Sequence, residues 1–152
     1  MRQGGWVGRR WAELGACAVV AAASAGCGGP GARALAFEDA DGSLSLSVGT
    51  FDRTCDQAHA LLLGCGRWEL YVNLEPEAWS GEQAIGTEII WAQAFIADGD
   101  PDGTECTMRG KVFEQGTIEI TEKVDDRVSF TVVGTELGEF NADGSYDASV
   151  CP

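Results

Sequence analysis

The feature that most limits the fold of this chain is the recurrence of short β-rich segments between turn-forming residues. Gly, Pro, Asn and Asp gather between these segments, at spacings typical of sandwiches and barrels. The segments are residues 43–48, 67–74, 87–96, 107–113, 117–124, 128–135 and 145–150. The sequence therefore predicts an all-β domain, a small antiparallel β-sandwich or barrel.

Alternation within the segments indicates which side chains face the core, because successive side chains of a strand point to opposite faces. In residues 67–74, the apolar side carries Trp68, Leu70, Val72 and Leu74. The opposite side carries Arg67, Glu69, Tyr71 and Asn73. We predict that the first set is buried in the core.

Two neighbouring segments, residues 117–124 and 128–135, predict a hairpin. Their apolar side chains share a face only if Ile120 stands opposite Phe130, because a slip of one residue inverts a strand. A two-residue turn would instead place Ile120 opposite Thr131. The pattern therefore predicts a loop with an odd number of residues, three or five.

The first thirty residues have the layout of a secretory signal peptide. Arg2, Arg9 and Arg10 precede an uncharged, Ala-rich run from Leu14 to Ala25, and Gly-rich sequence follows. A membrane-spanning helix needs about 20 strongly apolar residues, and this run is shorter. The segment is therefore interpreted as an export signal.

Ser24-Ala25-Gly26-Cys27 resembles the lipobox of bacterial lipoproteins, although Leu is usual in place of Ser24. In that family a signal peptidase cuts before the Cys, whose sulfur carries diacylglycerol. The resemblance covers this segment only, and it implies a signal peptide over residues 1–26 and lipidation of Cys27. The alternative is ordinary cleavage near Ala25 or Gly26, with Cys27 left as a free thiol.

A second stretch, Leu14-Gly15-Ala16-Cys17, has similar letters, but charged residues precede it and leave no apolar run for export. Residues 27–36 are predicted to form the lipidated Cys and a flexible tether, and residues 37–152 a single domain. The lipoprotein family carries Asp after the lipidated Cys in proteins that stay in the inner membrane. Gly28 occupies that place, so the resemblance implies a lipid-anchored protein of the outer membrane.

The chain is strongly acidic, with a formal net charge of −14. Such a surface repels phosphate backbones, which excludes nucleic acid as a partner. Six Cys and one His favour disulfides over zinc. The composition therefore indicates an exported, disulfide-bonded domain.

Cys55, Cys65, Cys106 and Cys151 are expected to form two disulfides, for which three pairings exist. We favour Cys55–Cys65 with Cys106–Cys151, although spacing alone leaves the choice open. A short helix is predicted near residues 55–63, where Thr54 and Gln57 form a capping-box pattern.

The acidic turn Asp98-Gly99-Asp100-Pro101-Asp102-Gly103 resembles the first half of the calcium loops of EF-hands. Asp98, Asp100 and Asp102 are the candidate metal ligands. Arg109 stands where an EF-hand loop has its bidentate Glu, so only a looser calcium site fits. The alternative is a solvated acidic turn.

Three tryptophans follow the signal peptide. Trp68 and Trp91 lie in predicted strands and are expected in the core. Trp79 lies in a turn-rich stretch, where it is a candidate contact for a sugar or a protein partner. Burial of Trp79 at the open end of a sandwich is the alternative.

No nucleophile, P-loop or zinc motif occurs in the chain, and His59 is its only histidine. We therefore expect no enzyme and no cofactor. The expected role is binding or scaffolding in the cell envelope, with an envelope protein or a glycan as partner. The alternatives are a calcium-dependent binding module and an envelope hydrolase that uses a pair of carboxylates.

Overall fold

The computed structural model describes residues 31–57, 63–136 and 141–152. The predicted signal peptide, Cys27 and His59 lie outside these ranges. Within them, nine strands form one mixed sheet in the order β4-β7-β8-β9-β1-β2-β3-β5-β6. The strands are β1 (Arg33–Glu38), β2 (Leu44–Gly49), β3 (Arg67–Leu74), β4 (Glu82–Ala84), β5 (Ile90–Asp98), β6 (Thr107–Val112), β7 (Thr117–Val124), β8 (Arg127–Val133) and β9 (Gly144–Cys151). The all-β prediction is confirmed.

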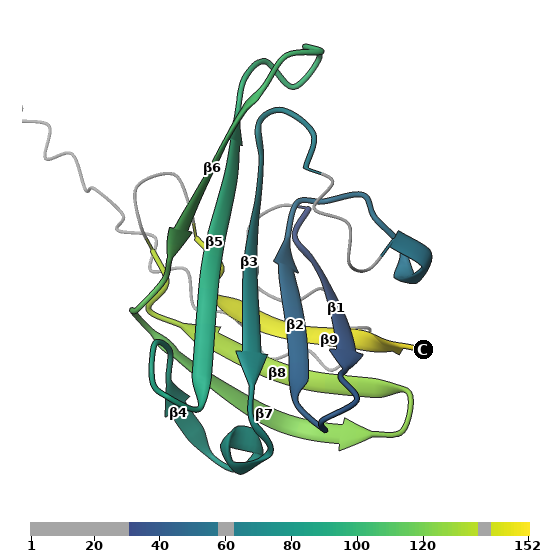
Figure 1. Ribbon diagram of the computed structural model, residues 1–152, viewed down its shortest axis with the longest axis vertical. Coiled ribbons are helices and arrows are strands. Elements are labelled where there is room, and N and C mark those ends of the chain that lie inside the picture. Colours follow the sequence, from purple (N-terminus) through teal and green to yellow (C-terminus); the bar gives the residue numbers. More distant parts are fainter. Residues whose placement is uncertain (1–30, 58–62, 137–140) are drawn as a thin grey trace, which may run out of the picture.

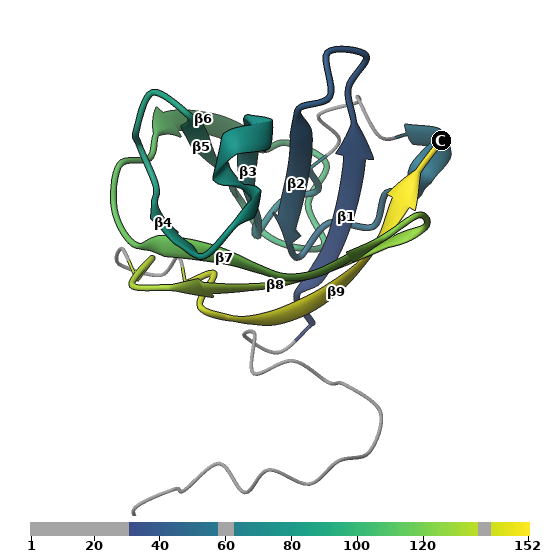
Figure 2. The ribbon, with the colours of Figure 1, turned by 90° about the horizontal axis from the view of Figure 1, so that it is seen from below.

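The sheet curls so that its two halves face each other. Figure 1 shows β2, β3, β5 and β6 in front, with β7, β8 and β9 crossing behind them. Figure 2, seen from below, shows the same two groups on opposite sides of the interior. The apolar sides of the alternating strands meet in that interior and form one core.

The predicted core side of β3 is confirmed. Leu70, Val72 and Leu74 are fully buried, and Trp68 packs against the same core while partly exposed. Phe130 of β8 and Ile118 of β7 contribute from the opposite half.

Two strands lie where the sequence predicts none. Strand β4 has three residues. Strand β1 begins at Arg33, so the prediction of a flexible tether is wrong for residues 33–36. Strand β1 pairs with β2 in antiparallel and with β9 in parallel orientation. Residues 33–38 form a strand because they lie between two others and pair with both. The sheet is mixed because the pairing of β1 with β9 is parallel.

The β7–β8 hairpin has the predicted register but not the predicted loop. Ile120 stands opposite Phe130. The loop has only two residues, because Val124 pairs with Arg127. A β-bulge between Ile120 and Glu122 adds one residue, Thr121, to β7 and restores the register. The apolar side chains reach the core through the bulge instead of an odd loop.

Helical structure is scarce among the described residues. The predicted helix near residues 55–63 is described only at its start, where η1 (Cys55–Gln57) is one turn of 3-10 helix. A second turn, η2 (Pro76–Trp79), follows β3. In the described part of the chain no helix is long and apolar enough to cross a membrane.

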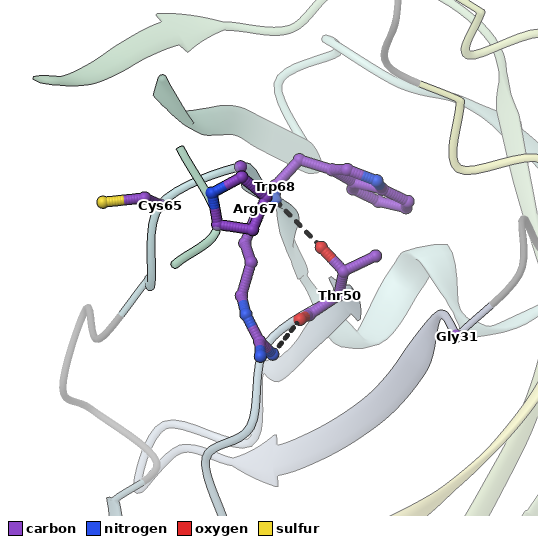
Figure 3. Close-up of a pocket in the computed structure, with 7 residues that line it drawn as sticks. Gly31, Thr50, Cys65, Arg67 and Trp68 are labelled. Carbon is purple, nitrogen blue, oxygen red and sulfur yellow. Dashed lines mark hydrogen bonds between the residues drawn. The ribbon is translucent and has the colours of Figure 1, made fainter. Parts of the chain in front are cut away.

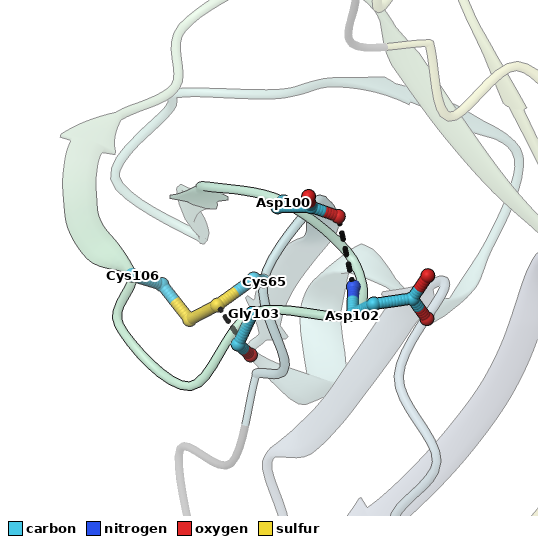
Figure 4. The surroundings of a disulfide bond; sticks show 5 residues. All are labelled: Cys65, Asp100, Asp102, Gly103 and Cys106. Atoms are coloured by element: carbon cyan, nitrogen blue, oxygen red, sulfur yellow. Dashed lines mark hydrogen bonds between the residues drawn. A yellow bond between two sulfur atoms is a disulfide. The ribbon is translucent and has the colours of Figure 1, made fainter.

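Both expected disulfides form, but the favoured pairing is wrong. Cys55 is bonded to Cys151 and Cys65 to Cys106, with Cα–Cα distances of 5.1 and 5.2 Å. The two ends of the segment between Cys55 and Cys65 are thus fixed to different partners, Cys55 to the end of β9 and Cys65 to the loop before β6. Figure 4 shows the second bond beside the acidic turn. Proximity in sequence did not decide the pairing, because the fold brings Cys151 next to Cys55 and Cys106 next to Cys65.

Candidate functional site

The surface that stands out lies on β2, β3 and β5, on the side opposite to the core. We call it the outer face and define it by Ser45, Tyr71, Asn73, Trp91 and Gln93. In the strand register, Ser45 stands opposite Asn73 and Asn73 opposite Trp91. Tyr71 stands opposite Gln93. Side chains that are opposite or diagonal on one face of a sheet lie within contact distance.

Trp91 is the exposed aromatic residue of the outer face. It is 46% exposed, so its predicted place in the core is wrong. Its ring meets that of Tyr71 in an edge-to-face contact, with ring centroids 6.0 Å apart. The alternation of buried Ile90 and Ala92 around it is the sequence signal that places Trp91 on the other side of β5.

Beside Trp91 the apolar surface continues onto β6. Val112 stands opposite Gln93 and is 50% exposed. Gly110 is the next β6 residue on this side. Because it has no side chain, the side chains of Gln93 and Phe95 occupy the space above it. A Cβ at Gly110 would lie 2.9 Å from Gln93 Nε2 and 3.2 Å from Phe95 Cε1. The missing side chain at Gly110 therefore lets Gln93 lie flat against the sheet.

A hydrogen-bonded network borders the two aromatic rings. The Ser45 hydroxyl donates to Asp39 Oδ2 at 2.9 Å. Since this uses its only proton, the hydroxyl of Tyr71, at 2.7 Å, must donate to Ser45 Oγ. Asn73 Nδ2 also donates to Ser45 Oγ at 3.1 Å and to Ser43 Oγ at 3.3 Å. All proton donors of the network are thus directed inward.

The direction of these bonds decides what the network offers to a ligand. The remaining lone pairs on Tyr71 Oη, Asn73 Oδ1 and the Asp39 carboxylate are acceptors. In the described part of the chain, no hydrogen bond ends on Asn73 Oδ1. The outer face therefore presents hydrogen-bond acceptors beside an exposed ring, and a matching ligand would carry hydrogen-bond donors.

The turn between β1 and β2 holds Asp39 in place. The Asp39 amide donates to Ser43 O at 2.9 Å, and the Gly42 amide donates to Asp39 O at 2.9 Å. Gly42 has φ of 86°, a conformation that residues with a Cβ rarely adopt. Asp41 Oδ1 accepts from the Ser43 amide at 3.0 Å, and this hydrogen bond holds the pKa of Asp41 below its ordinary value.

Next to the network, towards the start of β3, a buried ion pair occupies the same side of the sheet. Arg53 binds both carboxylate oxygens of Glu69, and both side chains are almost fully buried. Arg53 Nη2 also donates to Ser47 Oγ at 2.7 Å, and its guanidinium lies 4.5 Å from the ring centroid of Phe51. The charge of Glu69 is thus neutralised within the protein.

A second, smaller apolar cluster covers the sheet at the same end as this ion pair. Phe51 and Leu63 pack there against Ala97, with Leu35 and Phe95 at its margin. Phe51 and Leu63 thus cover part of this side of the sheet, whereas Trp91 stays exposed.

The predicted calcium ligands are not brought together. The Asp98 carboxylate binds Arg109, which holds the pKa of Asp98 below its ordinary value. Asp100 Oδ1 accepts from the Asp102 amide at 3.1 Å, as in a self-capped turn. In Figure 4 the Asp102 carboxylate points away from the Asp100 side chain. Across the described ranges, no group of three or more His, Cys, Asp or Glu residues is placed to hold a metal ion, so calcium binding stays a prediction without geometric support.

Trp79, the predicted contact residue, packs against the main core and is partly buried. Lys123 Nζ lies 4.7 Å from its ring centroid, so one side of the ring faces this ammonium. The same Lys123 Nζ binds Glu38 Oε2 at 2.9 Å. These contacts attach Trp79 to the fold, and Trp91 is the better candidate for contact with a ligand.

A shallow hollow of about 370 Å³ lies at the other end of β3 (Figure 3), lined by Gly31, Thr50, Cys65, Gly66, Arg67, Trp68 and Pro101. Arg67 donates to Thr50 O at 2.6 Å and forms an ion pair with Asp52 at 2.6 Å. That hydrogen-bonded ion pair holds the pKa of Asp52 below its ordinary value. No carboxylate lines the hollow, and its Cys65 is in a disulfide. It therefore offers no support for a hydrolase with a carboxylate pair.

Comparisons of the chain with models of protein families, with curated proteins and with solved structures find no match.

Proposed function

We propose that the protein is a lipid-anchored binding protein of the cell envelope, with the outer face as its binding surface and no catalytic activity of its own. The observation that carries the binding role is the Trp91–Tyr71 pair, in which the exposed Trp91 ring lies beside a row of hydrogen-bond acceptors. Large aromatic side chains with a polar border are typical of recognition surfaces. The opposite side of the same strands forms the core, so a rigid sheet carries this surface.

The anchoring part of the proposal is supported by the sequence alone. The lipobox-like Ser24-Ala25-Gly26-Cys27 follows an apolar run with a basic start. Acyl chains on Cys27 would hold the domain at a membrane surface, since two lipid signals are enough for stable anchoring. Between Cys27 and the first strand at Arg33 lie only five residues, so the domain would stay close to that membrane.

The anchor is tested by fractionation of bacterial cells that express the full chain. Cys27→Ser removes the proposed lipidation site, and the protein is expected to leave the washed outer-membrane fraction. Cys17→Ser is the matched control, because it changes the other cysteine of the signal region, and it should leave the protein on membranes. Membrane attachment of Cys27→Ser equal to that of the unchanged chain would contradict the proposal.

A further inference from the structure

We propose that the outer face binds a neutral polysaccharide, stacked on Trp91 and hydrogen-bonded to the acceptors of Tyr71, Asn73 and Asp39. This inference rests on the proposed binding function and names the class of its ligand. It follows from three properties of the outer face. These are the exposed ring of Trp91, a border that offers only hydrogen-bond acceptors (Tyr71, Asn73 and Asp39), and the absence of a free cation in that border.

The first property is the ring of Trp91. Pyranose sugars have a face of C–H groups with a partial positive charge, and the negative face of an aromatic ring attracts such groups. Trp91 is the most exposed aromatic residue among those described, and the edge contact with Tyr71 limits its rotation. The ring is thus held ready for stacking, which lowers the ordering cost of binding.

The second property is the direction of the hydrogen bonds. Ser45 is buried and uses its single proton on Asp39, while it accepts from Tyr71 and Asn73. This fixes the Tyr71 and Asn73 side chains with their acceptor lone pairs free. A ligand that fits must bring several donors, and the hydroxyl groups of a sugar are such donors.

The third property is charge. The border carries one carboxylate, Asp39, which is engaged with Ser43 and Ser45, while the nearby Glu69 is neutralised by Arg53. An anionic polysaccharide would find acceptors instead of donors, and a net charge of −14 would repel it. A cationic peptide would also bring donors, but the acceptors nearest to Trp91 are the neutral groups of Tyr71 and Asn73. Hydroxyl donors are satisfied by such neutral acceptors, which leave the charge of an ammonium group uncompensated.

The test measures retardation of the full chain in native gels that contain a neutral polysaccharide: galactomannan, xylan or a soluble β-glucan. The protein is exported in a bacterial host and purified in a detergent without a sugar headgroup, since such a headgroup would compete. Gels with alginate and with polylysine test the anionic and cationic alternatives. Titration calorimetry with the polysaccharide that retards the protein gives the association constant.

At least one neutral polysaccharide is expected to retard the protein. Trp91→Ala should weaken association about tenfold, the loss expected for one stacked ring, whereas Trp91→Phe should restore part of it. Tyr71→Phe should also weaken association. Val133→Ala is the control, because Val133 is 51% exposed on β8, away from the outer face.

The proposal would be overturned by a folded protein that no neutral polysaccharide retards, by retardation in alginate or polylysine alone, or by unchanged binding in Trp91→Ala. Circular dichroism verifies that each variant is folded. Cys27→Ser should retain polysaccharide binding, because the outer face does not include the anchor. Loss of membrane attachment and loss of sugar binding are therefore separate results, and each proposal can fail alone.

Discussion

The buried pair of Arg53 and Glu69 allows the sharpest test of the structure. Both oxygens of Glu69 are bound by the guanidinium, and only 3% and 2% of the two side chains are exposed. Arg53→Met leaves the Glu69 carboxylate buried without its partner, and Glu69→Leu leaves a buried guanidinium. Removal of one partner of a buried pair costs about 3–5 kcal/mol. Each single substitution should therefore consume a large part of a total stability of about 5–15 kcal/mol.

The double substitution Arg53→Met/Glu69→Leu separates this cause from simple loss of packing. It removes both charges, and an apolar pair of similar size is often as stable as the ion pair. The hydroxyl of Ser47 loses its Arg53 donor, at a cost of about 1 kcal/mol. We expect the free energy of unfolding of the double variant to lie within about 2 kcal/mol of that of the unchanged protein. It should be well above the free energy of unfolding of either single variant.

The assay is urea unfolding of the oxidised protein, followed by circular dichroism. Urea is chosen because guanidinium chloride is a salt and screens charges. If the free energy of unfolding of each single variant fell by less than about 1 kcal/mol, the interpretation of Arg53 and Glu69 as a buried ion pair would be refuted. A double variant that loses the sum of the two single losses would show that the residues act independently, and this would refute the argument from charge.

Three further predictions concern other parts of the chain. Burial and the negative charge of Asp143 raise the pKa of Tyr146 from 10.0 to about 12, so the free energy of unfolding should fall as the pH rises from 10 towards 12. Tyr146→Phe should remove this dependence in urea unfolding measured across that range, and an equal fall in the variant would contradict it. Deletion of Thr121 removes the β-bulge and turns Ile120 away from the core, so it should destabilise the domain far more than Thr121→Ala in thermal unfolding. Equal midpoints for the two variants would refute the role of the bulge. Thermal unfolding in calcium and in chelator should give the same midpoint, because the predicted ligands do not converge; a rise of several degrees that Asp100→Asn abolishes would restore the calcium site.

Much of the strand content was predictable from local patterns. The predicted bounds of β3 and β7 agree with the observed Arg67–Leu74 and Thr117–Val124. Their alternation also predicts the core side of β3 and the pairing of Ile120 with Phe130. Such features follow from the two-residue period of a strand, which is visible in a few neighbouring residues.

The candidate site was less predictable. Trp91 looks like a core residue when β-rich composition alone is considered, but its neighbours Ile90 and Ala92 take the inner side. The acceptors of Tyr71 and Asn73 depend on Ser45, in β2, and on Asp39, in the turn before β2. Both are distant in sequence from Tyr71 and Asn73. No local pattern states that these segments meet.

The sequence by itself determined the described strands other than β1 and β4, and which of their side chains are apolar, because alternation and turn residues act over short distances. Only the tertiary structure decided the parallel contact of β1 with β9, the bulge at Thr121 and the bonds of Cys55 to Cys151 and Cys65 to Cys106. Each of these depends on which distant segments lie side by side once the sheet has curled around its core. Burial of that core selects the arrangement as a whole.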